Sequence, residues 1–163
     1  MKTICSWMLN AKRPPRKMLE KLIVLAAQET GAGDCPAVSV VFLSAEQMAE
    51  ANMEMLGHKG PTDVISFDLR DPSLPRETED VSPGIELYIC PEVAAAEAEK
   101  RRLPYAGEVT LYLVHGFLHM AGEDDLTSQA KRKMRRAEKR VIRSLESKIN
   151  FERVFGAGLI PVR

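Results

Sequence analysis

The chain has 163 residues, of which 45% are hydrophobic, and its 23 basic and 23 acidic residues balance to a net charge of zero. This length and composition predict one globular domain with a sizeable core. They exclude an ordinary membrane-spanning protein, because no apolar run reaches the length of a transmembrane helix. The three cysteines, at positions 5, 35 and 90, are too far apart to suggest a disulfide framework or a cysteine zinc site. We therefore expect a cytoplasmic protein without a signal peptide.

The zero net charge hides an uneven distribution. Residues 131–143 contain eight Lys or Arg and a single acid, Glu138, whereas residues 68–99 contain nine acids against Arg70 and Arg76. A basic run of this kind is typical of a solvated helix face. It is equally typical of a surface that neutralises RNA phosphates, and the sequence leaves both interpretations open.

Alternating strands and helices are predicted for the first half of the chain. The stretch AVSVVFL is rich in β-branched residues, which favours a buried strand. Ser44 and Gln47 have the spacing of a capping box and predict the start of a helix. In chain order, we expect a strand within 1–10, a helix from the proline pair 14–15 to Gly31, a strand at 37–43 and a helix from 44 to about 56.

The second half contains the most informative segment, residues 104–120. Its apolar side chains leave almost no polar face, and a helix that is apolar all round is buried. Gly122 is placed to end this helix, and Thr127 or Ser128 can cap the basic helix that follows. In chain order, we expect a strand at 63–69, a loop at 70–84, a strand at 85–90, helices at 91–102, 104–120 and 127–147, and a tail at 148–163.

Two histidines on the predicted buried helix point to a metal site. His115 and His119 are four residues apart, so both rings leave the same helix face one turn apart. Histidines in so apolar a helix would be costly to bury without a partner. Gly122 lets the chain reverse, so that Asp125 can return as a third ligand. Asp124 is an adjacent alternative, and either acid could instead be a favourable charge at the start of the next helix.

The residue after the first histidine argues against a zinc peptidase. Peptidases with the pattern HExxH carry their general base there, whereas this chain has Gly116. A peptidase would need its base from elsewhere in the chain.

Three segments are similar to a known family. His115 to Asp125, HGFLHMAGEDD, resembles the signature of the YbeY endoribonucleases, or rRNA maturation factors, whose usual form is HGxLHLxGxDH. Residues 61–67, PTDVISF, resemble the family's PTDVLSF, and residues 84–89, GIELYI, resemble its GDIxI strand. The order of elements matches over about residues 5–146.

The resemblance implies a fold and an activity. The fold would be α+β, with a small mixed four-stranded sheet packed on about five helices, as a single domain over 1–147 followed by the tail 148–163. The activity would be metal-dependent, single-strand-specific endoribonuclease cleavage in the maturation of the 16S rRNA 3′ end and in ribosome quality control. The partners would be single-stranded rRNA and the small ribosomal subunit or its associated proteins, with no membrane partner, and the enzyme would be a monomer.

The sequence departs from the family pattern at two positions. The third ligand is usually histidine, and Asp125 stands in its place. We expect one zinc ion on His115, His119 and Asp125, although two imidazoles and a carboxylate also suit iron or manganese. The family's usual arginine in the loop before the Thr-Asp block corresponds to Leu56. We hypothesise that His58 replaces it and faces the cleft.

The remaining catalytic residues are less defined. We consider His58, Asp63 and Asp124 the candidates, with Glu123 as another possible base, and Lys59, Arg101 and the basic helix as candidate cations. Two alternatives stay open: a non-catalytic ribosome-assembly factor with a structural metal, and a metallohydrolase of another substrate. Three protein ligands leave a coordination position free, which favours catalysis, whereas His58 as a fourth ligand would favour a structural metal.

Overall fold

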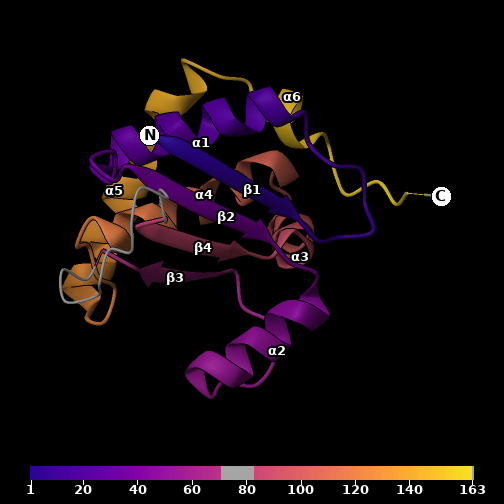
Figure 1. The fold of residues 1–163 in the computed structure, drawn as a ribbon, viewed down its shortest axis with the longest axis horizontal. Coiled ribbons are helices and arrows are strands. Elements are labelled where there is room, and N and C mark those ends of the chain that lie inside the picture. Colours follow the sequence, from indigo (N-terminus) through magenta and orange to yellow (C-terminus); the bar gives the residue numbers. More distant parts are fainter. Residues whose placement is uncertain (71–82, 163) are drawn as a thin grey trace, which may run out of the picture.

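The computed structural model, which describes residues 1–70 and 83–162, is a four-stranded mixed sheet packed against helices (Figure 1). The strand order is β1-β2-β4-β3, in which β1 and β4 run parallel to β2, and β3 runs antiparallel to β4. The expected α+β class with a small mixed sheet is confirmed. Most of the loop expected at 70–84 lies outside the described residues. The strands are β1 (Lys2–Trp7), β2 (Ala37–Phe42), β3 (Val64–Asp68) and β4 (Ile85–Ile89).

The helices begin and end close to the residues that their capping patterns predict. Ser44 and Gln47 form the expected capping box, and Thr127 caps the basic helix by accepting a hydrogen bond from the Ala130 N–H. No helix in the described part of the chain is both long and apolar enough to cross a bilayer. The helices are α1 (Arg16–Thr30), α2 (Ala45–Leu56), α3 (Pro91–Arg101), α4 (Tyr105–Met120), α5 (Ser128–Glu146) and α6 (Phe151–Phe155).

Helix α4 lies at the centre of the main core, between the sheet and helices α1, α5 and α6. Val109, Leu113, Val114 and Phe117 on this helix have no solvent-exposed surface. The prediction that residues 104–120 form a buried helix is therefore confirmed.

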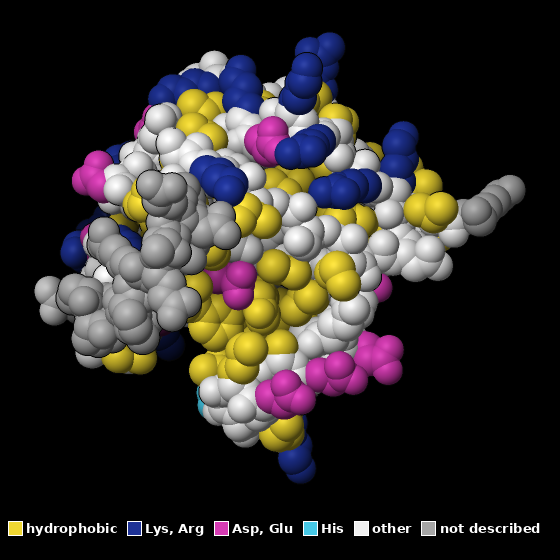
Figure 2. Space-filling view, in the orientation of Figure 1, with side chains coloured by type: hydrophobic (Ala, Val, Ile, Leu, Met, Phe, Trp, Pro, Cys, Tyr) yellow, Lys and Arg dark blue, Asp and Glu magenta, His cyan; other side chains and the backbone are white. Residues whose placement is uncertain are grey.

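The other face of the sheet is covered in part by α2. Side chains alternate along a strand, so that Val64 packs in the main core while its neighbour Ile65 packs against Met48 of α2. Figure 2 shows hydrophobic side chains gathered over this face of the molecule, with acidic side chains along its lower edge, where Figure 1 places α2. The metal-site prediction concerns α4, on the opposite side of the sheet.

The backbone of α4 approaches the sheet most closely at Gly116. A Cβ atom at this position would lie 3.1 Å from side-chain atoms of both Leu87 on β4 and Val64 on β3. Such a separation is tighter than ordinary van der Waals contact, and the core around it is closely packed. The glycine thus sets the distance between α4 and the sheet.

The segment after residue 147 packs differently from our expectation of an appended tail. Ile149, Phe151, Val154 and Phe155 are buried in the main core. The ring of Phe155 lies 6.1 Å from that of Phe42 on β2, edge to face. A bridge between Ala11 and Pro161 brings the last described residues beside the segment that follows β1. Residues 148–162 therefore form part of the same packed unit as residues 1–147.

We predict opposite effects of two glycine-to-alanine substitutions in α4. At Gly107 an added Cβ meets nothing within 4 Å, so Gly107→Ala should stabilise the protein by up to about 1 kcal/mol through helix propensity. At Gly116 the overpacking cost of about 1–3 kcal/mol offsets that gain. Urea unfolding should find Gly116→Ala at least about 1 kcal/mol less stable than Gly107→Ala, and equal stability would contradict the tight contact.

We also predict that the C-terminal helix contributes to global stability. Phe155→Ala should lower the free energy of unfolding by about 3 kcal/mol, the usual cost of removing a buried aromatic ring. Ile160→Ala is a suitable control, because Ile160 is 56% exposed, and should have little effect. Similar denaturation midpoints for the wild type and Phe155→Ala would mean that α6 detaches freely from the core.

Candidate metal centre

His115 and His119 lie one turn apart on α4 and direct one nitrogen each toward the same point. Their Nε2 atoms are 2.9 Å apart. After α4, Gly122 adopts the left-handed conformation with φ 94°, and the chain turns back. This reversal brings the Asp125 carboxylate to 4.0 Å from His115 Nε2 and 3.9 Å from His119 Nε2.

The three side chains form one group of potential metal ligands, with all three ligand atoms within 4.8 Å of one another. Two nitrogens bound to a tetrahedral zinc at about 2.0–2.1 Å lie roughly 3.4 Å apart. The imidazole nitrogens are slightly closer than this, and the carboxylate oxygens slightly further away. Small side-chain rotations would bring all three to one ion, so the donor set fits a divalent metal. Within residues 1–70 and 83–162, the group has no fourth member.

The second nitrogen of each ring is held by a hydrogen bond. His115 Nδ1 lies 2.6 Å from Glu138 Oε1 of α5, and His119 Nδ1 lies 3.0 Å from the Glu123 carbonyl oxygen. A carbonyl can only accept, so His119 donates from Nδ1 and leaves the Nε2 lone pair free. An ionised Glu138 imposes the same tautomer on His115. This arrangement is the usual one for metal-binding histidines.

The electrostatics of His115 are dominated by two opposing effects. Burial of the ring lowers its pKa, while the hydrogen bond and charge of Glu138 raise it, and the net pKa of His115 is raised. Asp63 and Asp125 add smaller contributions in the same direction. Carboxylates thus surround the His115 ring, whose Nε2 faces the ligand group. A cation bound at Nε2 would offset their negative charge.

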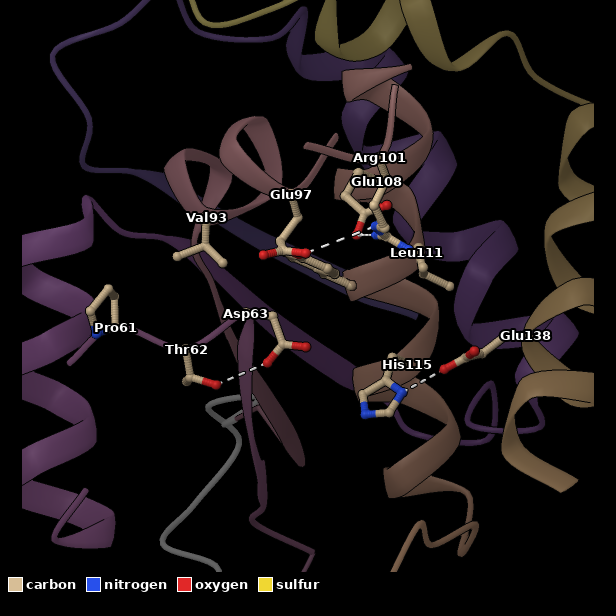
Figure 3. Close-up of a pocket in the computed structure, with 11 residues that line it drawn as sticks. Pro61, Thr62, Asp63, Val93, Glu97, Arg101, Glu108, Leu111, His115 and Glu138 are labelled. Atoms are coloured by element: carbon tan, nitrogen blue, oxygen red, sulfur yellow. Dashed lines mark hydrogen bonds and ion pairs between the residues drawn. The ribbon is translucent and has the colours of Figure 1, made fainter. Parts of the chain in front are cut away.

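A cavity of about 520 Å³ opens beside His115 (Figure 3). Its walls come from the loop before β3, from α3, from α4 and from Glu138 of α5. Arg101 of α3 is ion-paired with Glu108 of α4, a carboxylate with only 4% of its side chain exposed. Burial raises the pKa of Glu108, and Arg101 opposes that rise. The pair closes one end of the cavity.

The candidate catalytic residues differ in whether they line the cavity. Asp63 lines the cavity, and its Oδ1 accepts hydrogen bonds from the Thr62 hydroxyl and the Val64 N–H. Asp124 is exposed and accepts a hydrogen bond from the Leu126 N–H, whereas Asp125 joins the histidines. His58 and Leu56 are exposed, and neither is among the described residues that line the cavity.

Glu138 is the main site residue that the sequence analysis did not assign. In the sequence, Glu138 stands out only as the single acid within the basic run 131–143. That isolated acid was the one feature that could have pointed to a role for Glu138. The pairing of Arg101 with Glu108 was also missed, because Glu108 lies in a segment that we interpreted only as buried.

We predict that the hydrogen bond from Glu138 strengthens metal binding. Glu138→Gln keeps an acceptor but removes the charge, and should weaken zinc affinity by about tenfold or more. Glu146→Gln makes the same change at an exposed position on the same helix and should leave the affinity unchanged. Competition with a chelating dye measures both variants, and equal affinities would contradict a role for Glu138 in orienting His115.

Comparison with known proteins places this site in a family. Residues 8–146 match the family model described as Endoribonuclease YbeY. The endoribonuclease YbeY of Salinispora tropica is 33% identical over 129 residues, which cover 75% of this chain and 82% of that protein. The corresponding protein of Bacillus licheniformis is 33% identical over 129 residues, covering 76% and 81%.

A solved structure supports the fold. The solution structure of a protein from Thermotoga maritima matches with a TM-score of 0.55 at 23% identity, over 90% of this chain and 97% of that one. Because the family model spans most of the sequence, including the strand, cavity and ligand segments described above, the chain belongs to the YbeY family of endoribonucleases.

Proposed function

We propose that this protein is a metal-dependent endoribonuclease that cleaves single-stranded RNA and acts in ribosomal RNA processing. Membership of the YbeY family supports the reaction class. The observation that carries the proposal is the group of three ligand residues beside an open cavity, without a fourth ligand in the described part of the chain. A structural zinc normally has four protein ligands, so this arrangement favours catalysis over the assembly-factor alternative.

The proposed metal is a single zinc ion on His115, His119 and Asp125. Imidazole and carboxylate are both good zinc ligands, and the fixed Nδ1 hydrogen bonds present Nε2 of each ring to the ion. A bound divalent ion would supply Lewis-acid stabilisation of the charge that develops on a scissile phosphate. Iron or manganese would suit the same ligands, so metal analysis of the purified protein decides the identity.

The residues around the ligands would position the RNA strand. Lys131 and Arg135 precede Glu138 by seven and three residues, so they share its side of α5 and are exposed there. Cations on that side would contact phosphates next to the site. Among His58, Asp63 and Asp124, only Asp63 faces the cavity, and we propose it as the substrate-contacting residue of the three.

The proposed substrate is single-stranded rRNA of the small ribosomal subunit, at the 3′ end of 16S rRNA, in the cytoplasm. The shape of the site supports a single strand, because the cavity lies between α3, α4 and the loop before β3. A strand with unstacked bases can enter such a cavity, whereas a base-paired helix keeps its bases stacked inside.

We predict that cleavage depends on the ligand group. The zinc-loaded wild type should cleave a labelled single-stranded RNA but not the matched duplex, and His115→Ala should lose metal and at least about a hundredfold in cleavage rate. Cleavage that survives in His115→Ala would indicate a contaminating nuclease. Metal binding by the wild type without any cleavage would favour the assembly-factor alternative. His58→Ala belongs in the same assay, because a loss of cleavage would place His58 at the substrate.

A further inference from the structure

The cavity beside His115 has a charge balance that disfavours phosphate. Asp63, Glu97, Glu108 and Glu138 contribute four carboxylates to its walls, against the guanidinium of Arg101. Arg101 is itself occupied, since it pairs with Glu108 and lies 3.9 Å from Glu97. A phosphate inside the cavity would face net repulsion, which places the RNA backbone at the metal ligands and leaves the cavity for a neutral part of the nucleotide.

The rest of the wall suits a flat, partly apolar group. Val93 of α3 and Leu111 of α4 line the cavity, together with Pro61 from the loop before β3 (Figure 3). A volume of about 520 Å³ is ample for one nucleobase. Proteins that act on single-stranded RNA recognise unstacked bases through such pockets, by contact with the base faces and hydrogen bonds to the base edges.

Asp63 offers the cavity a hydrogen-bond acceptor in a fixed orientation. Its Oδ1 already accepts from the Thr62 hydroxyl at 2.9 Å and from the Val64 N–H at 2.8 Å. Its Oδ2 accepts no hydrogen bond from any residue in 1–70 or 83–162, and the second carboxylate oxygen of Asp63 faces the cavity in Figure 3. The two bonds to Oδ1 prevent the carboxylate from rotating, so Oδ2 stays available to a ligand.

We propose that this cavity binds one base of the RNA strand beside the scissile bond, and that Asp63 Oδ2 accepts a hydrogen bond from an exocyclic amino group of that base. Adenine, cytosine and guanine each carry such a group, whereas uracil presents carbonyl oxygens at the equivalent positions. At these exocyclic positions an oxygen of uracil would face the carboxylate oxygen and repel it, so uracil is the disfavoured base for this contact. This inference rests on the proposed function, because it assigns specificity to the same site.

A second metal ion is the competing occupant of an acidic cavity, and the geometry gives it little support. In the described part of the chain, His115, His119 and Asp125 are the group whose ligand atoms come close enough to share an ion. The carboxylates of Glu108 and Glu138 are engaged with Arg101 and His115. A neutral hydrogen-bond donor therefore fits the free Asp63 oxygen better than a cation does.

The test is the base preference of cleavage. A pool of single-stranded RNA with randomised sequence is digested with the zinc-loaded protein, and the new ends are sequenced. Loss of one hydrogen bond to a charged acceptor corresponds to about a tenfold effect, so uracil should be depleted about tenfold at one position flanking the cut. An even distribution of bases at every flanking position would overturn the proposal.

Asp63→Asn gives a sharper outcome. The amide oxygen can take over the two hydrogen bonds of Oδ1, so the NH₂ group replaces Oδ2 and turns the acceptor into a donor. The preference should then move toward uracil, which a merely structural role for Asp63 does not predict. Asp34→Asn makes the same change at an exposed position and should keep the wild-type preference. An unchanged preference in Asp63→Asn, or complete loss of cleavage with metal still bound, would contradict the assignment.

A binding measurement separates this inference from the proposed function. Fluorescently labelled hexanucleotides of adenosine, cytidine and uridine are titrated with the metal-loaded protein under conditions that prevent turnover. Uridine should bind about tenfold more weakly than cytidine, and Asp63→Asn should reverse that order. If the wild type cleaves no RNA, the proposed function fails while the binding order still tests the base pocket. Equal affinities would exclude the pocket even in an active enzyme.

Discussion

The burial of α4 is the constraint on which the site depends. A helix with apolar side chains on nearly every side must be enclosed, and here the sheet, α1, α5 and α6 enclose it. Enclosure fixes the rotation and height of the helix, and therefore the direction of the two imidazoles that it carries. The same packing places β3 alongside α4, so that Asp63, directly before β3, reaches the cavity next to His115.

The metal site is built from the buried helix α4 and from two neighbouring segments that add side chains to it. α4 supplies both histidines from the core, the chain reversal at Gly122 returns Asp125, and α5 contributes Glu138. These four side chains form the ligand group and its hydrogen bond. The cavity beside them is lined mainly by other residues, from α3, α4 and the loop before β3. Metal binding and substrate contact are thus assigned to different side chains that meet at His115.

Local patterns predicted most of the fold and the two histidines of the ligand group. The all-round apolar pattern identified α4, and the Ser44–Gln47 capping box located α2. The histidine spacing with Gly122 left both Asp124 and Asp125 as candidates, and the resemblance to the family signature indicated Asp125, which lies with the histidines in the structure. Glu138 could not be predicted in its role, because spacing within α5 carries no information on how α5 lies against α4. The packing of α6 was missed for a related reason: five residues are too few to show helical periodicity, and glycines and a proline follow them.

The close approach at Gly116 also limits how this fold could change its chemistry in evolution. A single substitution to glutamate would convert HGxxH into the HExxH pattern of zinc peptidases. The Cβ of that side chain would press against Leu87 and Val64, so the substitution would cost folding stability. The packing that positions the two histidines therefore also disfavours the peptidase pattern on this helix.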